Sequence, residues 1–213
     1  MSRPTARFAP ERLAPLPALP VTLSEAKAYC RSEDADDAIV AGLISAAVEP
    51  LDGPAGTLGR CLMPQTWRQP FAGFRDRLPL PVPVNTVSEV AYLDADGAMK
   101  TIDPACYQLV DPAGLPYVAR AKGFAWPATI EADRAAVFVT FSAGYETFPN
   151  PIKQAILLDV RRAYGALKAG ADLKKEVVEG VGSQEWDVSN SLDGKIADII
   201  SRMLAPYSRL GLL

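Results

Sequence analysis

The chain has 213 residues, of which 49% are hydrophobic and 22% are charged, a balance typical of a globular protein with one or two domains. It contains no histidine, so the commonest general base and the commonest metal ligand are both missing. The formal net charge of −3 excludes the strongly basic character of a dedicated DNA-binding protein, although a local basic patch remains open. Cys30, Cys61 and Cys106 form no CxxC pair, which predicts reduced thiols rather than a disulfide framework.

No segment of the sequence predicts secretion or insertion into a membrane. Residues 1–20 carry charges and lack the continuous apolar core of a signal peptide. No run approaches the about 18 apolar residues that a membrane span requires. We therefore expect a soluble protein that is made in the cytoplasm and does not associate with a membrane.

Residues 1–20 form a proline-rich N-terminal arm, with prolines at positions 4, 10, 15, 17 and 20. This spacing excludes a helix and favours extended backbone. Two interpretations stay open: a terminus without fixed contacts, or an arm that lies on a neighbouring subunit. In the second interpretation the apolar anchors are Phe8, Leu13, Leu16 and Leu19.

A first helical segment, residues 21–66, is expected to follow the arm. Thr22 and Glu25 have the spacing of a capping box and predict a helix that runs to about Arg31. We expect Asp34 to cap a second helix and Asp37 to lie in its first turn, where the helix dipole favours negative charge. We prefer this interpretation of the acidic residues 33–37 to a metal site.

The second helix is predicted from an apolar stripe with helical spacing, and it should end near Pro50. The stripe consists of Ile39, Val40, Leu43, Ile44, Ala47, Val48 and Leu51. A turn over residues 52–56 follows. Residues 57–65 fit either another helical turn or an extended link.

Residues 67–149 predict a β-rich region of five or six strands. Prolines 79, 81 and 83 restrict residues 78–84 to extended backbone at the edge of a sheet. Strands are expected at residues 87–93, 99–102, 107–110, 117–119 and 136–141, with a hairpin turn at Asp94–Gly97. Aromatic residues lie throughout this region, with a few cations nearby: Arg68, Arg75, Arg77, Arg120, Lys122 and Arg134. We interpret the aromatic residues as core rather than as a platform for single-stranded nucleic acid.

A second helical segment, residues 150–173, begins at Asn150 and Pro151, which have the order of a capping residue and a first-turn proline. Its apolar stripe predicts a buried face, and Gly170 should end the helix. The stripe consists of Ile152, Ile156, Val160, Ala163, Tyr164 and Leu167. In residues 174–213 we expect an extended stretch to residue 192, a helix from about Asp193 to Leu204 and a short apolar tail.

The order of helices, strands and helices predicts an α+β fold, in which an antiparallel β-rich region is inserted into a helical bundle between extended terminal arms. Sequence motifs for phosphate, dinucleotide, zinc-protease and serine-hydrolase sites are all missing. Acidic residues are plentiful, but no pair is singled out for glycosidase chemistry. We therefore predict a structural protein, not an enzyme, with no catalytic residue, metal or cofactor.

Several phrases, in this order and spacing, together resemble one protein family. They cover about residues 21–168 and comprise Leu23–Lys27, Ala41–Ala47, Gln65–Trp67, Leu80–Val84, Val87–Asp94, Trp126–Pro127, Phe141–Tyr145, Pro151–Ile156 and Tyr164. The chain is similar in these phrases to the head–tail connector (adaptor) proteins of long-tailed bacteriophages and related gene-transfer particles.

The resemblance implies a non-catalytic protein of the particle neck, made in the bacterial cytoplasm. It implies a ring, typically of twelve subunits in that family, beneath the portal at the capsid vertex. The ring would link the portal protein to a stopper or other tail-completion protein. Double-stranded DNA would pass non-specifically through its channel. A net negative charge suits such a conduit, because a strongly basic lumen would retain the genome by its phosphates.

The resemblance also suggests two sets of contact residues. In related connectors the C-terminal segment docks into the portal, which implies portal contacts by Ile199, Met203, Leu204, Tyr207, Leu210, Leu212 and Leu213. Lys153, Arg161 and Arg162 lie off the apolar stripe of their helix and are candidates for the channel or the subunit interface, or for a merely solvated face.

Two alternative functions stay open. The chain could be another ring-forming neck or tail protein, such as a stopper or a tail terminator. It could also be a monomeric β module that binds nucleic acid or carbohydrate and carries helical flanks.

Overall fold

The computed structural model describes residues 8–14, 18–130, 135–168 and 188–208, and for residues 188–193 the backbone alone. The fold is α+β, with four α-helices and two antiparallel sheets in the described residues. The chain divides into two compact units, each of which is described by itself. A helical unit comprises Leu19–Asp52, Gly56–Leu58 and Thr147–Leu213, and a sheet unit comprises Met1–Ala18, Gly53–Ala55 and Gly59–Glu146. No helix in the described part is long and apolar enough to cross a membrane.

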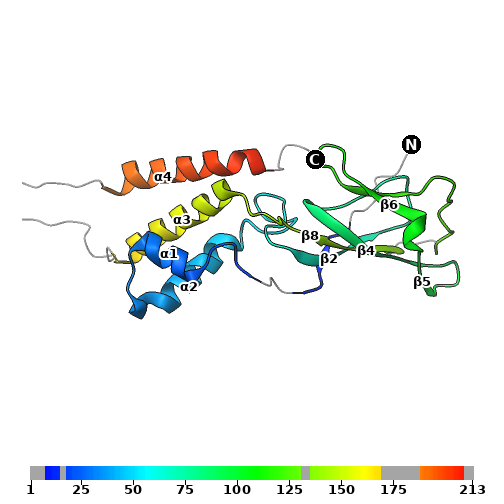
Figure 1. The fold of residues 1–213 in the computed structure, drawn as a ribbon, viewed down its shortest axis with the longest axis horizontal. Coiled ribbons are helices and arrows are strands. Elements are labelled where there is room, and N and C mark those ends of the chain that lie inside the picture. The colour runs from blue at the N-terminus through cyan, green and yellow to red at the C-terminus, as the bar shows by residue number, and fades with distance from the viewer. Residues whose placement is uncertain (1–7, 15–17, 131–134, 169–187, 209–213) are drawn as a thin grey trace, which may run out of the picture. The chain divides into compact units, whose positions relative to one another are not determined.

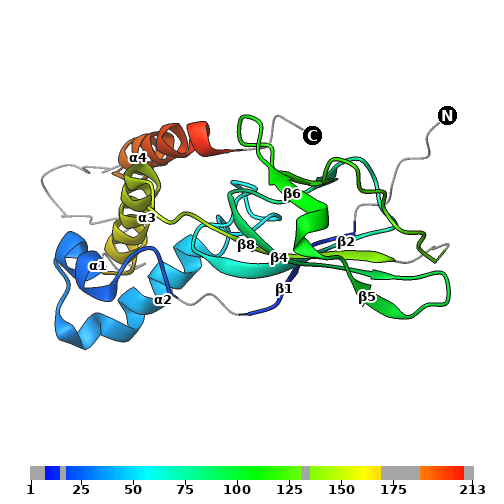
Figure 2. The same cartoon turned by 45° about the vertical axis from the view of Figure 1, so that its right-hand side comes forward.

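The helical unit is built on α3 (Asn150–Lys168), against which α1 (Leu23–Cys30) and α2 (Asp37–Val48) pack (Figures 1 and 2). The predicted capping box begins α1, and the left-handed Arg31 (φ 55°) ends it. A short 3₁₀ turn, η1 (Asp34–Asp36), leads into α2. The side chains buried among the three helices are Ala26, Val40, Ile44, Val48, Ile152, Ala155, Ile156, Leu157, Val160 and Tyr164.

The fourth helix, α4 (Val188–Leu204), lies alongside α3 and continues into a 3₁₀ turn, η3 (Ala205–Tyr207) (Figure 1). It begins at Val188, whereas the sequence predicted extended backbone to residue 192 and a helix from Asp193. The predicted extended stretch before residue 188 and the helix stop at Gly170 lie outside the described residues. The helix ends at Leu204, as the sequence predicted, and Pro206 lies in the turn η3 that follows.

The sheet unit contains a five-stranded and a three-stranded antiparallel sheet. The first has the order β1-β2-β8-β4-β5, from β1 (Glu11–Arg12), β2 (Gln65–Phe71), β8 (Val137–Ala143), β4 (Val84–Leu93) and β5 (Met99–Thr101). The second has the order β3-β7-β6, from β3 (Leu78–Pro79), β7 (Tyr117–Arg120) and β6 (Tyr107–Val110), which follows a short turn, η2 (Pro104–Cys106). The proline-rich β3 lies at a sheet edge, as the sequence predicted.

The core of the sheet unit draws side chains from both sheets. Every second residue of β2 and β8 is buried, which is the pattern of strands with one face on the core. Phe141 of β8 is fully buried and pairs in register with Trp67 of β2 and Val87 of β4. The predicted core role of the aromatic residues is thus confirmed for Trp67, Phe71, Tyr92 and Phe141.

The described part of the N-terminal arm lies on the chain's own sheet. Glu11 and Arg12 pair with Arg68 and Trp67 of β2, and the Phe8 carbonyl accepts a hydrogen bond from Gln69 Nε2 at 2.8 Å. Neither interpretation from the sequence foresaw this pairing. Of the predicted anchors, Phe8 is half-buried, Leu13 and Leu19 are 40% and 38% exposed, and Leu16 lies outside the described residues.

Two predicted helix caps are wrong by one or two residues. Asp36, not Asp34, is the residue before α2, because η1 occupies Asp34–Asp36, and Asp36 makes no side-chain cap hydrogen bond. Pro149, not Asn150, precedes α3, and its carbonyl accepts hydrogen bonds from the amides of Ile152 and Lys153. Asp37 does lie in the first turn of α2, as predicted.

Each helix buries only part of the apolar stripe that the sequence predicted, and the remaining stripe residues are exposed. Val40, Ile44 and Val48 are buried at a spacing of four residues, whereas Ile39 is 46% exposed because it lies beside that line. On α3 the buried stripe ends at Tyr164, and Leu167 in the last turn is 61% exposed.

Residues 57–65, whose conformation the sequence left open, form no helix: residues 57–64 are turns, an isolated bridge and irregular backbone, and Gln65 begins β2. Gly53 and Arg60 form an isolated bridge, and a second bridge joins Arg60 to Val82. Leu58, Cys61 and Leu62 are buried, so this link is part of the packed structure.

Candidate interaction surfaces

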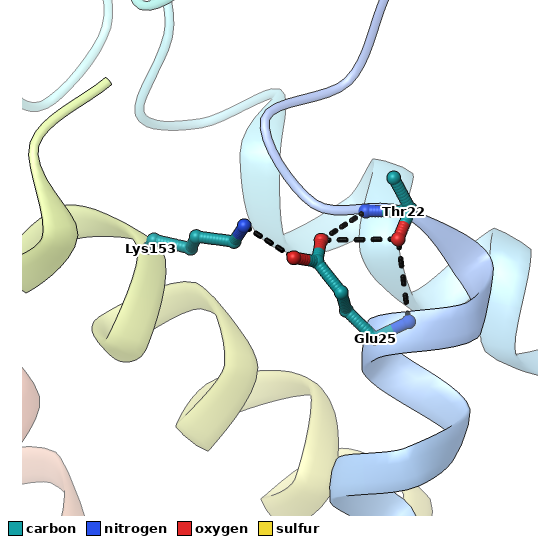
Figure 3. A network of polar contacts seen from close by, with 3 residues as sticks. All are labelled: Thr22, Glu25 and Lys153. Atoms are coloured by element: carbon teal, nitrogen blue, oxygen red, sulfur yellow. Dashed lines mark hydrogen bonds and ion pairs between the residues drawn. The ribbon is translucent and has the colours of Figure 1, made fainter. Parts of the chain in front are cut away.

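Lys153 of α3 is held in an ion pair with Glu25 of α1 (Figure 3). Glu25 also accepts hydrogen bonds at 3.0 Å from the Thr22 amide and hydroxyl, and its own amide donates to the Thr22 hydroxyl at 3.3 Å. The bond from Lys153, followed by those from Thr22, lowers the pKa of Glu25 to about 2. Lys153, one of the predicted channel or subunit-interface residues, therefore joins two helices of its own chain.

The other two predicted cations of α3 are exposed but also have local partners. The Arg161 guanidinium lies 5.9 Å from the centre of the Tyr29 ring in α1. Arg162 pairs with Asp159, one turn earlier, at 2.7 Å. The structure therefore does not gather Lys153, Arg161 and Arg162 into one free basic cluster, although Arg161 and Arg162 can still meet a partner.

Three acidic residues at the start of α2, Asp34, Asp36 and Asp37, form ion pairs with lysines of the same unit. Lys27 pairs with both Asp34 and Asp37, and Lys168 pairs with Asp36 at 2.9 Å. The Lys27 hydrogen bond lowers the pKa of Asp34, and the Tyr164 hydrogen bond, followed by that of Lys168, lowers the pKa of Asp36. No group of acidic or cysteine side chains in the described residues could hold a metal ion.

The predicted portal-contact residues that the structure describes lie on α4 and η3. Ile199 is 39% exposed, while Met203, Leu204 and Tyr207 are half-buried. Ile199, Arg202 and Met203 line a shallow hollow on the helix. Leu210, Leu212 and Leu213 lie outside the described residues.

A basic and aromatic surface of the sheet unit, which the sequence did not predict as a site, forms where residues 74–77 meet residues 120–129. Phe74 stacks on Trp126 with ring centres 4.5 Å apart, and Phe124 contacts Trp126 edge-on. Trp126 Nε1 donates a 3.0 Å hydrogen bond to the Arg75 carbonyl, which joins the two loops. We call this surface the Arg75–Trp126 surface; the segments that form it also carry the exposed cations Arg77, Arg120 and Lys122, of which Arg77 and Arg120 lie on opposite faces of the β3–β7 pair.

Comparison with solved structures finds the same fold in chains of gene transfer agent (GTA) particles. One belongs to the "neck of empty GTA particle computed with C6 symmetry", with a TM-score of 0.67 and 17% identity over 97% of this chain and 98% of that chain. Another belongs to the "neck of native GTA particle computed with C12 symmetry", with a TM-score of 0.62 and 19% identity over 97% and 98%. A third comes from the "virion of native gene transfer agent (GTA) particle", with a TM-score of 0.62 and 19% identity over 92% and 95%.

These likenesses establish a shared fold over nearly the full length of both partners. The resemblance to connectors of gene-transfer particles, predicted from the sequence, is confirmed at the level of the fold. No protein-family model matches the chain, and no curated protein matches it.

Proposed function

We propose that this chain is a structural protein of the neck of a virion or virion-like particle, with a scaffolding rather than a catalytic role. The observation that carries the proposal is the shared fold with two GTA neck chains, which extends over 97% of this chain and 98% of each neighbour. Nearly every part of the fold therefore has a counterpart in a neck chain, both in the helical unit and in the sheet unit.

Within the neck, we propose the adaptor position beneath the portal, as a ring that links the portal to the tail-completion proteins. The neighbouring necks were computed with C6 and C12 symmetry, which supports a ring of identical subunits, for which we propose twelve copies. A closed ring needs a heterologous interface, in which one face of each subunit fits a different face of the next. Because Lys153 is half-buried and paired with Glu25 on another helix, whereas Arg161 and Arg162 are exposed, the two arginines are the better candidates for the channel or the subunit interface.

For the portal contact we propose α4, η3 and the tail that follows. Ile199 exposes apolar surface beside Met203 and Arg202, and an exposed apolar side chain next to a hollow is suited to docking. The proposal extends this contact to the half-buried Leu204 and Tyr207 and to Leu210, Leu212 and Leu213.

The proposal is tested by native mass spectrometry of the purified chain with and without the portal protein. We expect a ring of defined copy number, formed alone or on the portal, and a stable complex between the two. A strict monomer that does not bind portal would contradict the adaptor role. A ring that does not bind the portal protein but binds a tail protein would instead favour a stopper or a tail terminator.

The contact residues are tested separately with matched variants of α4. The double variant Ile199→Ala/Met203→Ala should weaken portal binding at least tenfold, since two apolar contacts of about 1 kcal/mol or more each would be lost. Lys195→Ala/Asp198→Ala changes two exposed polar residues of the same helix and should bind normally. Truncation after Gly194 should abolish the joining of heads to tails; particles that still join would contradict docking through this segment.

A further inference from the structure

The turn between β6 and β7, residues 111–116, presents an apolar side chain in a fixed position. Leu115 is the largest apolar residue of this turn, and it is 45% exposed. Its amide donates a 3.3 Å hydrogen bond to the Pro112 carbonyl, and the two residues between them have positive φ, 58° and 77°. At the base of the turn, the carbonyl of the buried Pro116 accepts a 2.9 Å hydrogen bond from the Leu80 amide. The turn is therefore held in one shape, which lowers the entropic cost of a contact made through Leu115.

The Arg75–Trp126 surface is hollowed between residues 74–76 and 126–129, which line an open space of about 760 Å³. Phe74 and Trp126, whose rings are stacked and half-buried, supply the aromatic part of this lining. The hydrogen bond from Trp126 to the Arg75 carbonyl fixes the two sides of the hollow to each other. A space of this size with an aromatic wall can receive the tip of a protruding turn.

The turn and the hollow lie at opposite ends of β7. The turn leads directly into Tyr117, the first residue of β7, which pairs with Pro79, the last residue of β3. Because β3 and β7 are antiparallel, the residues that precede β3 lie toward the other end of β7, at Arg120. The four residues of β7 span about 13 Å, so Leu115 cannot enter the hollow of its own chain.

The turn and the hollow carry complementary charges. Asp111 is the one charged residue of the turn, and Arg75 is exposed at the hollow. Neither side chain has a hydrogen-bond or ion-pair partner within the described part of the chain. The other charged residue of the hollow, Asp76, lies 4.0 Å from Arg120. An incoming turn would therefore place its carboxylate opposite an available guanidinium.

We propose that Leu115 of one copy of this chain enters the hollow of the Arg75–Trp126 surface of the next copy, with Asp111 facing Arg75. Every copy carries both the turn and the hollow, so a second copy completes the contact without any other protein. Because the two differ and lie at opposite ends of β7, the contact is heterologous, and each subunit can make it with two neighbours. The inference rests on the proposed ring and names one of its subunit contacts.

Charge reversal tests the polar half of the contact by native mass spectrometry of the full chain, alone and on the portal protein. Asp111→Arg and Arg75→Asp each place like charges together, and each should raise the protein concentration needed for half-maximal ring assembly about tenfold. The double variant Asp111→Arg/Arg75→Asp pairs opposite charges again and should return this concentration to within about threefold of the unmodified value. Asp96→Arg is the matched control, since it reverses an exposed aspartate in the turn between β4 and β5 of the same unit, and it should assemble normally.

Leu115→Ser tests the apolar half and should weaken ring assembly about tenfold. Its control, Met99→Ser, removes a side chain that is 60% exposed on β5 and should have no effect. Rings that form equally well with Leu115→Ser, or charge reversals that the double variant does not correct, would overturn this contact and leave the ring itself in place. Intact Leu115→Ser rings that no longer bind the portal protein would also overturn it, and would assign the turn to the portal. An unmodified chain that forms no ring, alone or on the portal, would overturn the proposed function as well.

Discussion

The Tyr164 hydroxyl of α3 donates a 2.6 Å hydrogen bond to Asp36 Oδ2, immediately before α2. Lys168, one turn later on α3, pairs with the same carboxylate. Asp36 is the residue before α2, but its side chain makes no cap hydrogen bond to that helix and instead accepts hydrogen bonds from Tyr164 and Lys168 of α3. This contact joins two segments that are 128 residues apart in the sequence.

Tyr164→Phe should lower the stability of the helical unit, because it removes the hydroxyl that hydrogen-bonds a carboxylate while keeping the ring. We expect the midpoint of thermal unfolding at pH 7 to fall by a few degrees. Tyr29→Phe is the matched control, since it removes a tyrosine hydroxyl from the same unit where the structure shows a contact to the ring alone. Equal midpoints for the two variants would contradict the importance of the Asp36 contact.

The pairing of Glu25 predicts a loss of stability in acid. Its pKa falls from the ordinary 4.5 to about 2 in the folded chain, so the unfolded chain binds the proton more readily. The stabilising contribution is therefore complete above about pH 4.5 and disappears as the pH falls toward 2. Glu25→Gln should reduce the difference between urea midpoints measured at pH 5.5 and pH 3.

Glu33→Gln provides the control for this pH dependence. Glu33 is exposed and precedes η1 in the same unit, where its side chain makes no cap hydrogen bond. It should retain the full acid sensitivity of the unmodified chain. If Glu25→Gln and Glu33→Gln showed the same pH profile as the unmodified chain, the Lys153–Glu25 pair would not contribute measurably to stability.

The parts of the fold that the sequence predicted are those with local signals. The capping box of Thr22 and Glu25 forms as predicted, and the Asp94–Gly97 turn closes the hairpin between β4 and β5 through a 3.0 Å hydrogen bond. Pairing between distant segments could not be predicted in the same way. The contact of β1 with β2 depends on backbone hydrogen bonds between extended segments, which almost any sequence can make.

The candidate surfaces likewise divide into one with a local signal in the sequence and one that depends on contacts between distant segments. The apolar residues of α4 were recognised because they repeat along one helix, whereas the Arg75–Trp126 surface joins two loops that are far apart in the sequence. The two loops come together through the Trp126–Arg75 hydrogen bond and the pairing of β3 with β7, and neither contact has a local signal in the sequence. Lys153 was predicted to be available for a partner because it lies off the apolar stripe of α3. In the structure it pairs with Glu25 of α1, a contact that the pattern of one helix cannot reveal.

Gly42 in the middle of α2 predicts a simple stabilising change. A β-carbon built at this position meets no atom within 4 Å, and the residue is exposed. Gly42→Ala should raise the free energy of unfolding by about 0.5–1 kcal/mol, because glycine is a poor helix former and gains nothing from packing here. Urea denaturation measures the change, and a destabilised variant would show that the helix backbone is not regular at this residue.

Gly144, directly after β8, predicts the opposite outcome for the same substitution. Its amide donates a 2.9 Å hydrogen bond to the Pro83 carbonyl, its φ is +135°, and a β-carbon would lie 2.1 Å from the Met63 carbonyl oxygen. Because backbone must move to admit a methyl group, Gly144→Ala should cost about 3 kcal/mol or more. Gly73→Ala is the control, since its β-carbon would meet only Thr129 Oγ1 at an ordinary 3.6 Å. Equal urea midpoints for the two variants would mean that the chain between Met63 and Pro64 is free to yield, and that the end of β8 is not fixed by this close approach.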